Sequence, residues 1–233
     1  MGWIDPVATY AVPPRLSDPA PSHDWTRETG DRGDSRWDIV DAVVAAGALP
    51  LDDCEALDIE NSTFEGVTFV GRTMPQISAS RTTLVGCDMS GGRFVSLRNV
   101  RFVDCKLVGA DFNGADLRDV SLERCVLRLA NLRMVKLRRV QFIDCTLHDV
   151  DVYDLDAEDV GFANSDLERV NIDRLRARRV DLRGTRRLGL EHLGALDGCL
   201  VTHDQLLELR YRLAFTAGLS IERAVAVDAS RTD

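Results

Sequence analysis

The chain has 233 residues, of which 45% are hydrophobic, and this is enough to bury a core in one or two domains. Its formal net charge of −9 argues against direct nucleic-acid binding, because neutralising phosphates takes an excess of Lys and Arg. The chain has no apolar run near the roughly 18 residues that span a bilayer and no secretory leader, so we expect a cytoplasmic protein without membrane contact, whose cysteines are reduced.

The N-terminal part is acidic and changes character near residue 34. Residues 1–56 hold 11 acidic and 4 basic side chains. Residues 1–33 are rich in Pro, Asp, Ser and Gly without periodicity, which predicts a disordered or loosely ordered segment. Ser35 and Asp38 then resemble a helix capping box, and Gly47 can end a helix. One helical face would carry Trp37, Val40, Val43 and Val44. We therefore predict a capping helix and linker over residues 34–56.

From residue 57 an apolar side chain recurs at every fifth position. The first run comprises Ile59, Phe64, Phe69, Met74, Ala79, Leu84, Met89 and Phe94. The second comprises Leu97, Phe102, Leu107, Phe112, Leu117, Leu122, Leu127, Leu132, Leu137, Phe142, Leu147, Val152, Ala157, Phe162, Leu167, Ile172, Ala177 and Leu182. Two positions before each of these centres in the second run, from Val95 to Val180, stands a smaller and nearly always apolar residue. Neither a helix nor a flat strand has this spacing, which predicts a chain that turns a corner every five residues.

A longer period of twenty lies on top of the fives. Cys105, Cys125 and Cys145 recur at this distance, as do Val100 and Val120. Twenty residues make four faces of five, so a square coil would place each residue above its counterpart in the previous coil at the strand spacing of about 4.8 Å.

These stretches resemble the pentapeptide-repeat family, whose consensus is Ala-Asp/Asn-Leu-X-X. The matching residues are Ala110–Gly114, Ala115–Asp119, Ala130–Met134 and Ser165–Arg169. The resemblance implies an all-β fold, a right-handed quadrilateral β-helix, over residues 57–184 in roughly six coils. Two departures predict distorted coils near residues 72–81 and 91–99, because Arg72 takes a small-residue position and Phe94 to Phe102 is two residues short.

The C-terminal segment, residues 185–233, carries a second helix signal. Thr202 and Gln205 form a capping-box pattern, and Gly218 can end the helix. Its apolar face comprises Leu206, Leu209, Leu213 and Ala217. Because a solenoid needs its open ends covered, we expect this face to cap the last coil. The family resemblance implies a second use, a homodimer through the C-terminal segment.

We find no pattern for catalysis, a cofactor or a metal. The stacked cysteines replace the consensus alanine and point inward, where a linear stack lacks the tetrahedral arrangement that zinc prefers. The four histidines show no ligand spacing, and the chain lacks a nucleophile elbow and a phosphate loop. The sequence therefore predicts that the protein is not an enzyme.

Outward charges are the candidate interaction features. Columns at steps of twenty alternate in sign, as in Asp119, Arg139, Asp159 and Arg179. Such stacks predict ion pairs between coils and a face that cancels its own field. A candidate interaction patch, rich in carboxylates, comprises Asp144, Asp149, Asp151, Asp154, Glu158 and Asp159.

Two functions follow from these features. The first is a non-enzymatic scaffold whose flat faces bind a protein partner. The alternative is implied by the family resemblance, since its quinolone-resistance members imitate B-form DNA and bind DNA gyrase. In that case the carboxylates of the patch would stand in for phosphates. Because Arg and Lys interrupt every face, the sequence favours the scaffold.

Overall fold

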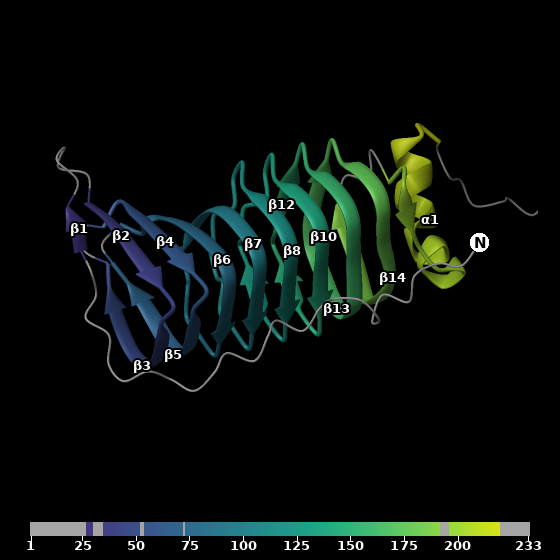
Figure 1. Cartoon of the computed structure of the whole chain (residues 1–233). Coiled ribbons are helices and arrows are strands. Elements are labelled where there is room, and N and C mark those ends of the chain that lie inside the picture. Colours follow the sequence, from purple (N-terminus) through teal and green to yellow (C-terminus); the bar gives the residue numbers. More distant parts are fainter. Residues whose placement is uncertain (1–26, 30–34, 52–53, 72, 192–195, 220–233) are drawn as a thin grey trace, which may run out of the picture.

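The protein is a parallel β-solenoid closed by one helix, as the computed structural model shows for residues 27–29, 35–51, 54–71, 73–191 and 196–219 (Figure 1). Its elements are β1 (Arg27–Thr29), β2 (Ser35–Val40), β3 (Val43–Pro50), β4 (Ala56–Glu60), β5 (Thr63–Val70), β6 (Gln76–Val85), β7 (Arg93–Val103), β8 (Asp116–Glu123), β9 (Val126–Arg128), β10 (Lys136–Ile143), β11 (Thr146–His148), β12 (Asp151–Tyr153), β13 (Asp156–Asp173), β14 (Arg176–Glu191), β15 (Cys199–Leu200) and α1 (His203–Thr216).

Successive coils stack in parallel at the predicted step of twenty. Strands β8, β10, β13 and β14 bring Leu117, Leu137, Ala157 and Ala177 into one column. Backbone bonds follow the same step between other faces, as from the Phe112 amide to the carbonyl of Asn131. The solenoid has about eight turns, two more than the sequence predicted.

The core is a single column of side chains inside the coils. In most fives both inward positions are buried, the small one, as Ala110 and Val120, and the large one, as Phe112 and Leu122. Aromatic rings stack along the axis, and the Phe142 and Phe162 centroids lie 4.8 Å apart. Since every strand buries one face inside the coil, the other residues of each five are left for the surface.

From Asn99 to Arg179 each corner of a coil is made by a residue in the left-handed conformation. In one coil the φ angles of Asp144, Asp149, Asp154 and Asp159 are 53°, 54°, 52° and 57°. Asn, Asp and Gly tolerate this conformation best. Arg139, Leu129 and Met134 adopt it too, with φ of 54°, 57° and 55°.

The predicted N-terminal capping helix is wrong, because residues 35–50 form strands β2 and β3 of the first coil. The fives extend back through Ile39, Val44, Leu49 and Cys54, and all but Val44 are fully buried. Trp37 and Val44 pack against the core, whereas Val40 and Val43 are 51% and 37% exposed, so the apparent helical face combines inward and outward residues of two strands. Most of the segment 1–33 lies outside the described residues, but Arg27–Thr29 pairs antiparallel with β2.

The predicted irregularity near residues 91–99 is confirmed. Asp88 pairs with both Thr68 and Lys106, and Ser96 pairs with Ser78 and Asp116, so the segment 88–96 is two residues shorter than its neighbours on either side. Part of this difference in length is taken up by a register shift between Ile77 and Ser78, where the pairing step of β6 with β7 changes by one residue. Val95, predicted to point inward, is instead 44% exposed.

The solenoid continues past the predicted limit of residue 184. Strand β14 runs to Glu191, and Leu188 and Leu190 are buried. The step between β13 and β14 changes from 20 to 21 residues at several points, as from Ser165/Thr185 to Asp166/Arg187, which hides the period in the sequence.

Helix α1 begins as the sequence predicts. The Thr202 hydroxyl accepts a hydrogen bond from the Gln205 amide at 3.2 Å, and the Gln205 side chain accepts one from the Thr202 amide at 2.8 Å. This capping box satisfies two amides that the first turn leaves open.

Candidate protein-interaction surface

The six acidic residues of the candidate patch do not form one surface. Asp144, Asp149, Asp154 and Asp159 occupy four successive corners of one coil, so their side chains point away from the axis in different directions. Asp151 lies in β12 and Glu158 in β13, on two different faces. Although these six residues are close together in the sequence, they lie in a ring around the solenoid.

Each of the six has a partner one coil away. Asp149 accepts both the Nε and NH2 groups of Arg169, and Asp159 accepts the same pair from Arg179. The other pairs are Asp151 with Arg133 at 2.9 Å, Asp154 with Arg176 at 2.6 Å, Glu158 with Arg178 and Arg179 at 3.2 Å, and Asp144 with the amide of Asn164. The ring is therefore largely neutralised by the adjoining coils.

These pairs shift the acidity of the corner carboxylates. The hydrogen bonds from Arg169 hold the pKa of Asp149 below its usual range, and those from Arg179 do the same for the pKa of Asp159. On the neighbouring face, the Arg138 guanidinium lowers the pKa of Asp156. All three are charged at neutral pH, where they hold the coils in register.

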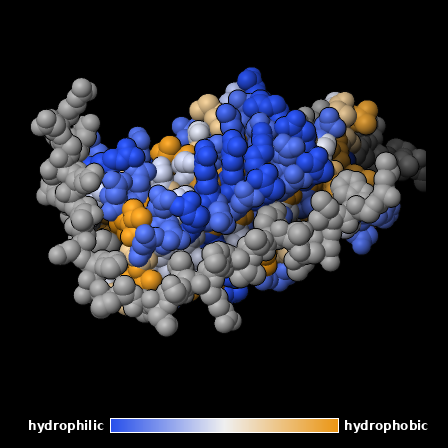
Figure 2. Space-filling model, in the orientation of Figure 1, coloured by the Kyte–Doolittle hydropathy of each residue, from blue (hydrophilic) through white to orange (hydrophobic). Residues whose placement is uncertain are grey.

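The column Asp119, Arg139, Asp159 and Arg179 is confirmed as a stack of ion pairs. Arg139 contacts Asp119 through its Nε at 2.6 Å, and Arg179 contacts Asp159 at 2.5 Å. Similar pairs join Arg124 to Asp104 at 2.7 Å. Hydrophilic residues accordingly dominate the side of the solenoid seen in Figure 2.

The cysteine column belongs to the core. Cys87 extends it by one coil, at a step of 18 residues that the short segment 88–96 hides in the sequence. The Cys105 thiol donates to the carbonyls of Leu84 and Val103, both at 3.4 Å. Its hydrogen bond with Cys125, together with burial, raises the pKa of Cys105 to about 12. Uncharged buried thiols are poor nucleophiles and poor metal ligands.

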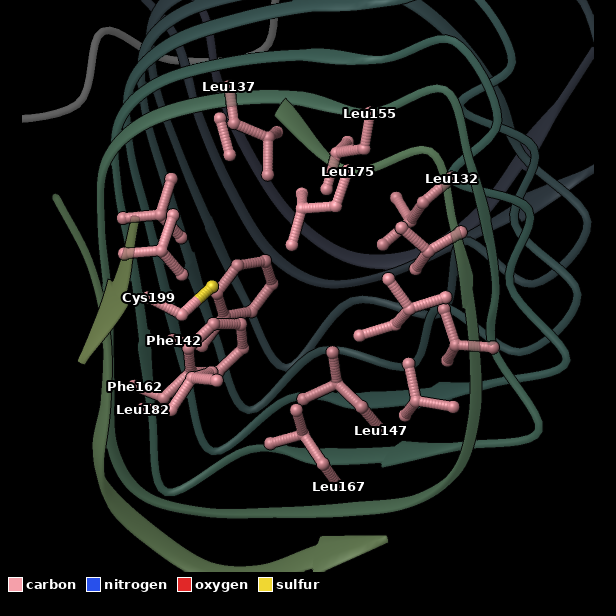
Figure 3. Close-up of a pocket in the computed structure, with 17 residues that line it drawn as sticks. Leu132, Leu137, Phe142, Leu147, Leu155, Phe162, Leu167, Leu175, Leu182 and Cys199 are labelled. Carbon is pink, nitrogen blue, oxygen red and sulfur yellow. The ribbon is translucent and has the colours of Figure 1, made fainter. Parts of the chain in front are cut away.

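An apolar cavity of about 60 Å³ lies inside the C-terminal coils (Figure 3). Ala157, which stands in column with Leu137, lines it together with Phe142, Phe162 and Cys199. Its lining contains no polar group apart from the thiol, so the cavity offers nothing for acid–base catalysis.

The predicted face of α1 splits in two. Leu209 is buried and Leu213 packs against the core, so both cap the last coil, whereas Leu206 is 46% exposed and Ala217 is exposed. The helix also has an outer stripe that was not predicted from the sequence, with the helical spacing of four: Leu207, Tyr211 and Phe215 are 44%, 56% and 83% exposed.

A second group of exposed apolar residues flanks one face of the solenoid. Leu129 and Met134 occupy consecutive corners and are 63% and 49% exposed. Beside them the Tyr153 ring lies between two guanidinium groups, with Arg133 4.7 Å and Arg174 5.3 Å from its centroid. The fives pattern did not single these residues out, because they stand at its outward positions.

Other classes of site find no support in the described part of the chain. Within those ranges, His, Cys, Asp and Glu side chains form no group of three that could hold a metal ion. The described helix is also too short and too polar to cross a membrane.

Comparison with known proteins agrees with the fold. A family model described as a pentapeptide repeat region matches residues 95–172. Two solved structures are similar at low identity. A trypsin-treated variant of QnrB1, a plasmid-mediated fluoroquinolone resistance protein, is 17% identical over 79% of this chain and 100% of its own, with a TM-score of 0.38. HetL, a pentapeptide repeat protein involved in heterocyst differentiation regulation in the cyanobacterium Nostoc sp. strain PCC 7120, is 16% identical over 70% and 86%, with a TM-score of 0.21. No curated protein matches in sequence.

Proposed function

The chain is a member of the pentapeptide-repeat family through its solenoid, and from that premise we propose that it is a non-enzymatic scaffold whose faces bind a protein partner. Neither its surface charges nor the apolar cavity in its C-terminal coils forms a catalytic arrangement within the described residues. What the fold offers instead is a set of flat, regular faces held rigid from coil to coil.

The observation that carries this proposal is the pairing of surface charge between coils. Bidentate contacts such as Arg139 with Asp119 and Arg169 with Asp149 tie one coil to the next. Exposed pairs of this kind add little stability individually, typically about 0.2–1 kcal/mol. They do fix the register of one coil on the next, and they neutralise the charge of the surface. A rigid surface with little net field suits recognition by shape and local contacts.

A pull-down with the full chain tests the scaffold proposal, followed by cross-linking and mass spectrometry on the captured complex. We expect a partner whose cross-links fall on the solenoid between residues 35 and 191. A parallel chain lacking residues 1–33 tests whether the acidic N-terminal segment contributes. Cross-links confined to residues 1–33, or loss of every partner in both chains, would contradict a role for the solenoid faces.

The alternative is a DNA mimic that binds DNA gyrase and alters its activity or its fluoroquinolone sensitivity. A long rod bearing carboxylates at regular steps supports it. The arginine partners of Asp149, Asp154 and Asp159 weigh against it, because a phosphate mimic needs its negative charge free.

A supercoiling assay with purified gyrase, alone and with a fluoroquinolone, separates the two functions. The mimic predicts inhibition or drug protection that disappears when Asp149, Asp151 and Asp154 are replaced by Lys. Glu65→Lys, on an early coil, is the matched control. If the native chain at micromolar concentration changes neither supercoiling nor drug sensitivity, the DNA-mimic function is refuted.

We also propose a homodimer through α1. The outer stripe of Leu207, Tyr211 and Phe215 exposes large apolar side chains in a row, and a second copy of the helix would cover them. Analytical ultracentrifugation of the native chain and of Tyr211→Glu/Phe215→Glu tests this. A monomeric native chain at 100 micromolar would refute it.

A further inference from the structure

We propose that the face around Leu129, Met134 and Tyr153 is the partner-binding surface of this solenoid, and that it recognises a protein segment with an apolar side chain between carboxylates. This inference rests on the scaffold function proposed above and gives that function a location and a partner chemistry.

Leu129 and Met134 occupy positions that are unfavourable for them in two ways, in backbone conformation and in exposure to solvent. Their φ angles of 57° and 55° belong to the left-handed region, which suits Gly, Asn or Asp. Their side chains are nevertheless 63% and 49% exposed, so burial does not repay the unfavourable backbone. In the same corner columns stand Gly109 and Gly114 one coil earlier and Asp149 and Asp154 one coil later. Arg169 and Arg174 follow two coils later, so Leu129 and Met134 are the apolar members of these columns between Gly109 and Arg174, and they lie at both edges of a single face.

The residues between and beside this pair are those that protein interfaces prefer. Arg133 precedes Met134 and lies against Tyr153, whose other side faces Arg174. Tyr, Arg and Met are enriched at protein interfaces, and Tyr and Arg dominate their binding energy. Tyr153 ends β12, labelled near the top of Figure 1.

The charges around the face point to carboxylates on the partner. Arg133 is paired with Asp151 at 2.9 Å. Arg128 beside Leu129, Lys136 beyond Met134 and Arg174 on Tyr153 are exposed and have no carboxylate within 4.0 Å among the described residues. Asp173 lies in the coil after Tyr153 and bounds the face there. Three cations without a carboxylate contact of their own lie around two apolar side chains, on a face that also carries Asp111 and Asp151, and they complement an apolar residue flanked by acids. Duplex DNA is a poorer fit, because phosphates gain nothing from Leu129 and Met134.

The test uses the full chain with ¹³C-methyl methionine, observed by NMR. The chain has four methionines, of which Met89 is buried, so the Met134 methyl reports on the surface and Met89 on the core. Met134→Gly assigns the signal. The probe is a synthetic peptide with a central Leu-Phe pair flanked by Asp on both sides. One control peptide has Ser-Ser at the centre, a second has Asn for Asp, and a short DNA duplex is the fourth ligand.

We expect the acidic apolar peptide to shift Met134 but not Met89, and to bind at least tenfold more tightly than either control peptide. Leu129→Gly/Met134→Gly should lose at least tenfold in affinity, measured by anisotropy of the labelled peptide, without a lower melting temperature, because glycine suits both corners. Asn164→Gly, at another corner of the same conformation, should bind as the native chain does.

A peptide that leaves Met134 unshifted, or the double variant binding as tightly as the native chain, would overturn the assignment. So would a duplex that shifts Met134 as strongly as the acidic peptide. A partner that cross-links elsewhere on the solenoid would leave the scaffold function standing and refute only this location.

Discussion

The Gln205 side chain of α1 donates a hydrogen bond to the Thr185 hydroxyl at 2.9 Å and so ends a column that runs through the solenoid. Going back by coils, the same column holds Ser165, Cys145 and Cys125. Gln205 also donates to the Leu182 carbonyl at 2.9 Å and is 8% exposed. The first turn of the terminal helix therefore takes the place of the next coil, and one side chain joins helix and solenoid.

Replacing this side chain should loosen the helix without unfolding the solenoid. In Gln205→Leu the Thr202 amide loses its acceptor, whereas the Thr185 hydroxyl loses one donor but keeps its own bond to the Leu182 carbonyl; an unsatisfied buried group costs about 1–3 kcal/mol. Hydrogen exchange should accelerate by roughly tenfold or more in His203–Thr216 and remain unchanged in Lys136–Ile143. Glu208→Gln, on the exposed side, is the control. Equal acceleration in both segments would mean that the two parts unfold together.

The solenoid can be predicted from the sequence because its apolar period has a direct physical cause. The chain turns a corner every five residues, and each five places one large and one small side chain in the core. The same pattern reaches back to Ile39, but there the competing signals of Ser35 and Asp38 resemble a helix start. Insertions such as that at Arg187 break the period without breaking the coil, since a bulge absorbs one residue.

The candidate patch was harder to predict, because sequence distance and surface distance differ in a coil. Asp144 and Asp154 are ten residues apart and occupy different corners, whereas Asp149 and Arg169 are twenty apart and touch. Reading along columns instead of along the chain predicts the ion pairs. Exposure at the corners, as for Leu129, depends on backbone conformation and has no signature in the fives.

The native protein should present one slowly reacting thiol. Cys199 is half-buried and the other five cysteines are fully buried. Burial, with a contribution from Asp197, raises the pKa of Cys199 to about 11, so at pH 8 only about 0.1% of it is thiolate. An aromatic disulfide reagent should modify one thiol slowly in the native state and six after urea denaturation. Cys199→Ala should abolish the native reaction, and rapid loss of several thiols would contradict a closed core.

Acid should weaken the solenoid through its corner pairs. Arg169 and Arg179 lower the folded-state pKa values of Asp149 and Asp159 below the unfolded value of about 3.9. A lowered pKa adds stability above the unfolded pKa, and this is lost as pH falls through the folded pKa. Melting temperature should therefore be flat from pH 7 to about pH 5 and fall below it. Asp149→Asn/Asp159→Asn should lower the plateau and reduce the fall, and a fall of unchanged size would assign the effect to other carboxylates.

Filling the internal cavity should stabilise the C-terminal coils. Ala157 lines the cavity of about 60 Å³, and Leu137 precedes it in the same column. A void costs about 24 cal/mol per Å³, so Ala157→Leu should raise the free energy of unfolding by about 1 kcal/mol, read as a higher urea midpoint at unchanged slope. Ala130 is equally buried but lies outside the cavity lining, so Ala130→Leu should overpack the core and lower stability by about 1–3 kcal/mol. The two substitutions add the same atoms, but Ala157 stands at a large inward position beside the cavity, whereas Ala130 stands at a small inward position away from it. If both destabilise alike, the interior near Ala157 has no room for a larger side chain.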